Sequence, residues 1–110
     1  MGDDSGMMLT MLIADDEAAI QNSLRQILNW KELGIELIDT ASDGLEALQL
    51  IRMHKPDIVL TDIKMPFCDG IELIKQTRSL KLQTKFIILS GYDDFEYAKK
   101  RFNTRFLPIC

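Results

Sequence analysis

The sequence is poor in cysteine, in histidine and in long apolar runs, and each shortage excludes a class of protein. Its 110 residues include two cysteines, Cys68 and Cys110, and one histidine. Two cysteines are too few for a disulfide framework, so we expect reduced thiols, and no cluster of cysteine and histidine favours zinc. No apolar run reaches the roughly 18 residues that a membrane-spanning helix needs. The sequence therefore indicates a cytoplasmic protein that does not enter a membrane.

Basic residues are also in short supply. The chain has 13 lysines and arginines against 17 acidic residues, which gives a formal net charge of -4. Binding to a polyanion needs a basic stripe that neutralises its phosphates, and the sequence has no such stripe. We therefore expect no direct binding of nucleic acid by this chain.

The rest of the composition is typical of one folded domain. Hydrophobic residues make up 46% of the chain and charged residues 27%, and a chain of this length can bury a single core. Residues 1–6 are small or acidic and lack the pattern of a secretory signal, so we interpret them as a disordered leader or cloning remnant. The domain is then expected over residues 7–110.

Short apolar runs alternate with amphipathic segments along this domain. The runs predict buried strands over residues 7–14, 35–41, 57–61 and 86–89. Apolar residues at steps of three and four predict helices over residues 17–30, 43–54 and 71–80, with a short one from about residue 94. Asp16 is placed to cap the first helix. Single helices between strands imply right-handed crossovers, and so an α/β fold with a doubly wound parallel sheet.

Acidic and hydroxyl residues follow three of the predicted strands. Asp15 and Asp16 come after the first strand, Asp62 after the third and Ser90 after the fourth. The carboxyl ends of parallel strands meet at one edge of a sheet, so we expect these residues to gather there. Three carboxylates in one place repel one another, and Mg²⁺ is the cation that best suits such a set of oxygen ligands.

A metal ion beside a carboxylate suits phosphoryl transfer, since it neutralises the oxygens that carry charge in the transition state. Aspartate can form an aspartyl-phosphate, and Asp62, the single acid at the end of the central strand, is the best candidate nucleophile. Taken alone, the pair Asp15 and Asp16 could be a helix cap and Ser90 part of an ordinary turn. Their common placement at strand ends favours the site.

The segments at these strand ends resemble the receiver domain of two-component response regulators. They read LIADDEA at 12–18, DIVLTDIKMPFCDG at 57–70 and FIILSGYDDFEYAKK at 86–100. The resemblance implies a flavodoxin-like strand order 2-1-3-4-5, with Asp62 as phosphoacceptor and Mg²⁺ positioned by Asp15 and Asp16. It also implies a metal ligand in the backbone carbonyl of Lys64 and a switch hydroxyl in Ser90. The last segment is similar to receivers of AraC-type regulators.

The resemblance ends after Lys100. Family members continue with a fifth strand that ends in a lysine–proline pair and with a final helix, whereas this chain reads RFNTRFLPIC. The lysine that pairs with the phosphoryl group has no clear equivalent, and residues 102–109 are either a degenerate fifth strand or, as we favour, an irregular tail. An open sheet edge and uncovered apolar surface would favour association, so we expect a homodimer, with exchanged elements as one form of it.

Three functions are compatible with this pattern. The leading one is a signalling phosphoacceptor that takes a phosphoryl group from a sensor histidine kinase onto Asp62 and shifts the Ser90 loop. We expect no enzyme activity beyond weak autophosphorylation and autodephosphorylation. The alternative is a non-switching interaction module, in which the missing lysine and helix have abolished signalling. A magnesium-dependent phosphohydrolase is less favoured, because no general acid stands two residues after Asp62.

Overall fold

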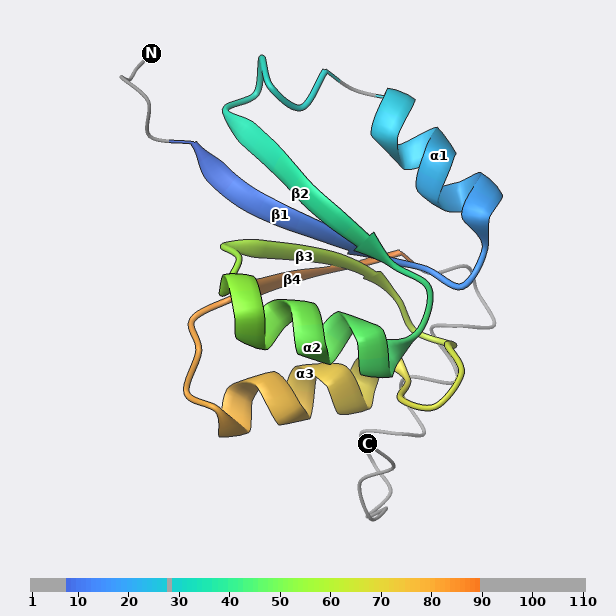
Figure 1. Cartoon of the computed structure of the whole chain (residues 1–110), viewed down its shortest axis with the longest axis vertical. Coiled ribbons are helices and arrows are strands. Elements are labelled where there is room, and N and C mark those ends of the chain that lie inside the picture. Colours follow the sequence, from blue (N-terminus) through green and yellow to red (C-terminus); the bar gives the residue numbers. More distant parts are fainter. Residues whose placement is uncertain (1–7, 28, 90–110) are drawn as a thin grey trace.

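The computed structural model describes residues 8–27 and 29–89, in which strands and helices alternate. The elements are β1 (Leu9–Ala14), α1 (Ala18–Ile27), β2 (Ile35–Ala41), α2 (Gly44–His54), β3 (Ile58–Asp62), α3 (Gly70–Ser79) and β4 (Lys85–Leu89). The strands form one parallel sheet in the order β2-β1-β3-β4 (Figure 1). The α/β class and the first four positions of the predicted order are confirmed. The prediction that the fifth strand and final helix are degenerate or missing concerns residues outside those described, as do the predicted helix from residue 94 and the leader.

The two central strands are buried on both faces, which explains why their sequences are continuous apolar runs. In β1, Met11 and Ile13 pack toward α1, whereas Leu12 and Ala14 belong to a cluster that includes residues of α2 and α3. Figure 1 shows the same division, with α1 on one side of the sheet and α2 and α3 on the other. This arrangement leaves the carboxyl ends of the strands to carry the loops of the site.

Helices α2 and α3 begin in the same way, with an aspartate cap followed by glycine. The side chain of Asp43 accepts a hydrogen bond of 2.8 Å from the backbone N–H of Glu46, and Asp69 does the same with Glu72 at 2.8 Å. Each cap satisfies one of the N–H groups that a helix leaves without a partner in its first turn. The two Asp-Gly pairs thus set where both helices start beside the ends of the strands.

Helix α1 differs from its prediction at both ends, since it begins at Ala18 and ends at Ile27. Asp16 does not cap it in the expected way: the carboxylate of Asp15 accepts from the backbone N–H of Glu17 at 2.9 Å. Asp15 is 3% exposed, so burial at the end of β1 turns this carboxylate back toward the start of the helix. None of the helices in the described ranges has the length and apolarity needed to cross a membrane.

One expectation about the cysteines is wrong. Cys68 takes part in a disulfide in the structure, whereas the low cysteine count predicted a reduced thiol. Its neighbours in the chain could not reveal this, because a disulfide depends on contacts distant in sequence. Cys110 lies outside the described residues. The argument for a cytoplasmic location from reduced thiols therefore does not hold for Cys68.

Candidate functional site

Three carboxylates meet at the carboxyl edge of the sheet. Ala14 of β1 pairs with Thr61 of β3 in parallel register, so the residues that follow them, Asp15 and Asp62, are neighbours across the two strands. One carboxylate oxygen each from Asp15, Asp16 and Asp62 lies within 4.8 Å of the others. The structure thus brings together the three acids that the sequence predicted to gather.

The three carboxylates differ in exposure and are held by backbone hydrogen bonds. Asp15 is buried, Asp62 is partly buried and Asp16 is exposed. Asp62 accepts a hydrogen bond of 2.7 Å from the backbone N–H of Ile63, and Asp15 accepts the bond from Glu17 described above. These bonds orient the two less exposed carboxylates, and Asp16 leaves the cluster accessible to solvent.

The crowding of negative charge affects the pKa of Asp15. Burial is the largest cause that raises this pKa above its ordinary value of 3.8, and the charges of Asp62, Asp16 and Glu17 raise it further. The hydrogen bond from the backbone of Glu17 lowers the pKa and offsets part of this effect. A hard cation among these oxygens would relieve the repulsion, and the all-oxygen donor set fits Mg²⁺.

This raised pKa predicts how stability depends on pH. The folded protein holds more protons than the unfolded chain between the two pKa values of Asp15, so stability falls as the pH rises through that window. With a chelator present, we expect Asp15→Asn to raise the free energy of unfolding at pH 7 by roughly 1 kcal/mol. Urea unfolding should show this gain shrinking as the pH is lowered toward the ordinary aspartate value of about 4, and no gain below it.

The matched control for that experiment is Asp39→Asn. Asp39 is exposed on β2 and also accepts a backbone hydrogen bond, from Thr40 at 2.8 Å. Its substitution should change stability by less than the Asp15 substitution at pH 7. A gain in Asp15→Asn that is the same at acidic and neutral pH would show that ionisation of Asp15 is not its cause.

Gln21 of α1 supports the site in a way that the sequence analysis missed. Its side-chain amide donates to the backbone carbonyl of Asp15 at 2.7 Å and to that of Ala41 at 3.1 Å. These bonds tie α1 to the carboxyl ends of β1 and β2. The helical pattern identified only the apolar positions of this segment. A polar residue in the first turn of a helix that follows an acidic pair could have indicated a hydrogen bond to the end of the strand.

The other two predicted site residues are less closely defined by the structure. Lys64 follows Asp62 in the loop to α3, and its side chain is exposed between the buried Ile63 and Met65. The metal-ligand role of its carbonyl remains a prediction. Ser90 lies outside the described residues, directly after Leu89, which pairs with Asp62 in the register of β3 and β4. Its role as a switch hydroxyl also remains a prediction.

The α/β fold, with a parallel sheet and an acidic cluster at its carboxyl edge, agrees with the family that comparisons with known proteins identify. Residues 11–106 match the response regulator receiver domain, and the chain belongs to this family. A response regulatory protein of Staphylococcus epidermidis is 49% identical over 92 residues, which cover 84% of this chain and 36% of that protein. The transcriptional regulatory protein YesN of Bacillus subtilis is 45% identical over 93 residues, covering 84% of this chain and 25% of YesN.

Solved structures show the same relationship. The receiver domain of AraT, a response regulator from Geobacillus stearothermophilus, has a TM-score of 0.79 at 40% identity, covering 88% of this chain and 75% of that one. A two component transcriptional regulator AraC from Clostridium phytofermentans has a TM-score of 0.76 at 42% identity, covering 84% and 71%. These likenesses confirm the resemblance to receivers, including those of AraC-type regulators. The chain spans well under half the length of the two sequence relatives.

Membership of the family defines the general role of the chain. Receiver domains are the phosphoacceptor modules of two-component systems, and in general they are signalling modules and not enzymes. Response regulators receive their phosphoryl group from sensor histidine kinases. Receiver domains generally use Mg²⁺ at an acidic pocket, and in this chain Asp15, Asp16 and Asp62 form an acidic cluster.

Proposed function

We propose that Asp62 is the phosphoacceptor of this chain and that Asp15, Asp16 and Asp62 hold the Mg²⁺ that transfer requires. The observation that carries this proposal is the approach of the three carboxylates to within 4.8 Å at the open edge of the sheet. Asp62 is the member best placed to react, because it ends the central strand and is partly exposed. Asp15 is buried and is better suited to hold a cation than to meet a donor.

In the proposed reaction, a carboxylate oxygen of Asp62 attacks the phosphorus of a phosphohistidine. The P–O bond to Asp62 forms as the P–N bond to the donor breaks, and the imidazole nitrogen keeps the electron pair and takes up a proton. The hydrogen bond from the backbone N–H of Ile63 orients the attacking carboxylate. Bound Mg²⁺ would neutralise charge on the phosphoryl oxygens during transfer.

Intact mass spectrometry with a small donor tests this proposal directly. After incubation with acetyl phosphate and Mg²⁺, we expect the protein to gain the mass of one phosphoryl group. Replacing Mg²⁺ by a chelator should prevent the gain, because the three carboxylates would then repel the incoming anion. A protein that gains no mass with Mg²⁺ present would contradict the proposal.

Several finer assignments belong to the same proposal. They are a metal-ligand role for the Lys64 carbonyl, a switch role for Ser90, weak autophosphorylation and autodephosphorylation, a cytoplasmic location, and no direct binding of nucleic acid. The proposed receiver domain covers residues 7–110, with an atypical part after about residue 100.

We also propose a homodimer, supported by 51% and 37% exposure of Ile87 and Ile88 on β4, the last strand of the described sheet. Light scattering that shows only monomer at high concentration would exclude it.

A further inference from the structure

Phe67 combines a strained backbone with an exposed aromatic ring, in the loop that follows Asp62. Its φ is 70°, in the left-handed region that bulky residues rarely adopt. Its side chain is 67% exposed, so most of the ring contributes no burial to the core. Neither feature stabilises the fold, and strained residues that persist tend to occur at functional sites.

The strain comes from a tight turn that the surrounding structure holds in place. The backbone N–H of Cys68 donates to the carbonyl of Pro66 at 2.7 Å, which closes a three-residue γ-turn centred on Phe67. The form of this turn with positive φ is the rare and strained one. Proline fixes one flank, and Cys68 on the other is fully buried against Gly44, where a Cβ would lie 1.7 Å from the Cys68 carbonyl oxygen. The ring is therefore held outward.

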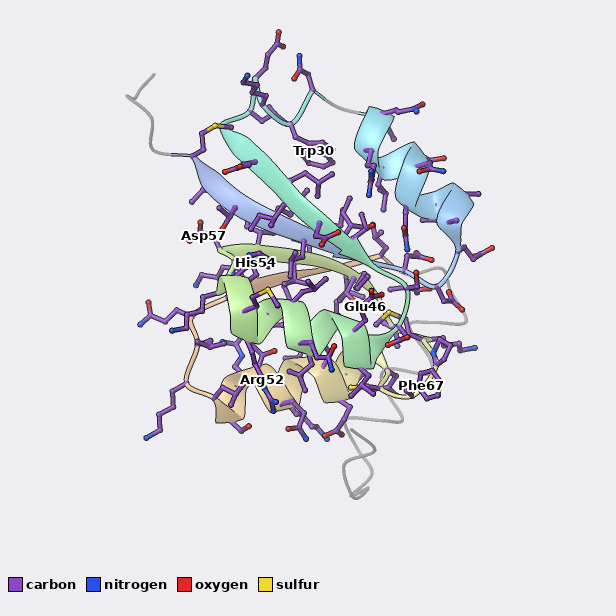
Figure 2. The ribbon with its side chains drawn as sticks, viewed as in Figure 1. Trp30, Glu46, Arg52, His54, Asp57 and Phe67 are labelled. Carbon is purple, nitrogen blue, oxygen red and sulfur yellow. The ribbon has the colours of Figure 1, made fainter. Side chains whose placement is uncertain are left out.

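The ring lies at the end of the molecule that carries the site. Figure 2 shows Phe67 on the same side as Glu46, in the first turn of α2, and away from Arg52 and His54 at the other end of that helix. The carboxyl end of β3, with Asp62, is at this same end. A protein that delivers a phosphoryl group to Asp62 must approach over this rim of the molecule.

We propose that Phe67 is a specificity-determining contact for the protein that donates the phosphoryl group. The ring inserts into an apolar hollow on the donor. Asp16 and Glu17 are exposed, so basic residues beside that hollow would complement their negative charge. Rigid aromatic side chains are common anchors at the centre of protein interfaces. A small phosphodonor reaches Asp62 without needing the ring. This inference rests on the proposed phosphoacceptor function.

The substitution Phe67→Gly tests the inference, because glycine accepts a positive φ and the variant loses the ring without straining the turn. The probes are acetyl phosphate and a panel of autophosphorylated sensor-kinase domains, from which the one that labels the wild type fastest is chosen. We expect labelling by acetyl phosphate to be unchanged and transfer from the kinase to slow by at least about tenfold. The midpoint of thermal unfolding should be unchanged or higher.

Two further variants separate the ring from general effects. Phe67→Tyr keeps an aromatic ring and should retain most of the kinase transfer. Met53→Ala removes a side chain that is 71% exposed near the far end of α2, and it should leave both rates unchanged. Retained transfer in the tyrosine variant, together with loss in the glycine variant, supports the proposed contact.

Each other outcome overturns the inference. Equal slowing with both donors would place the effect at Asp62 and not at the donor interface. Unchanged kinase transfer in Phe67→Gly would show that the donor does not use the ring. If acetyl phosphate labels the wild type but no kinase does, a sensor kinase is excluded as the donor, and the inference fails. A wild type that neither donor labels would refute the proposed function itself, and the inference with it.

Discussion

Replacing Asp62 with asparagine is expected to abolish uptake of the phosphoryl group, whichever donor is offered. An amide oxygen is a far weaker nucleophile than a carboxylate, and the substitution also removes one of the three charges proposed to hold Mg²⁺. The shape of the side chain is kept, and an amide oxygen can still accept from the backbone N–H of Ile63. Intact mass after incubation with acetyl phosphate and Mg²⁺ should therefore show no added phosphate.

Asp57→Asn is the matched control, because Asp57 precedes β3 at the opposite rim of the sheet. Its carboxylate accepts from the backbone N–H of Thr10 at 2.8 Å, and an amide oxygen can take over that bond. This variant should gain phosphate as the wild type does. Undiminished phosphate uptake by Asp62→Asn would assign the reaction to another residue.

The asparagine variant at position 62 should also remain folded, so unfolding would not explain its loss of phosphate uptake. The charge of Asp62 is one of the causes that raise the pKa of Asp15. Removing it relieves repulsion at the edge of the sheet, so the metal-free variant should unfold at an equal or higher urea concentration than the wild type. If the variant has normal stability, its loss of phosphate uptake results from the loss of the Asp62 carboxylate and not from a loss of structure.

The arrangement of these acids could be predicted because it depends on strand direction and not on fine detail. Apolar runs marked the strands well enough that β2 was predicted with its observed bounds, Ile35–Ala41. Once strands joined by single helices are parallel, acids that follow them must meet at one edge. An error of one or two residues at a strand end does not change that edge, so the meeting of Asp15 and Asp62 was predicted correctly.

Features that depend on contacts between distant segments could not be predicted in the same way. Both Asp15 and Asp16 were plausible partners for the start of α1, and only burial at the end of β1 decides that Asp15 accepts from Glu17. The left-handed backbone of Phe67 depends on the packing of Cys68 against Gly44, in a different element. Local sequence carries little information about such contacts, so these features appear only with the fold.

The glycine that begins α3 links stability to the phosphorylation site, and Gly70→Ala should damage both. A Cβ at Gly70 would lie 2.4 Å from the carbonyl oxygen of Asp62 and 3.0 Å from the Cα of Ile63. These are backbone atoms, which cannot move aside as a flexible side chain can. Alanine normally favours a helix over glycine by up to about 1 kcal/mol. Here we expect a net loss of about 3 kcal/mol in the free energy of unfolding, measured with urea.

Gly34→Ala separates this steric effect from a purely conformational one. Gly34 has a φ of 77°, but a Cβ there would meet no atom within 4 Å, so its substitution should cost about 1 kcal/mol through backbone strain alone. It should also leave the rate of labelling by acetyl phosphate unchanged. Gly70→Ala should slow that rate, because the atoms it displaces carry the carboxylate of Asp62 and the N–H of Ile63 that orients it. Equal losses of stability in the two variants, with normal labelling in both, would mean that α3 does not hold Asp62 in position.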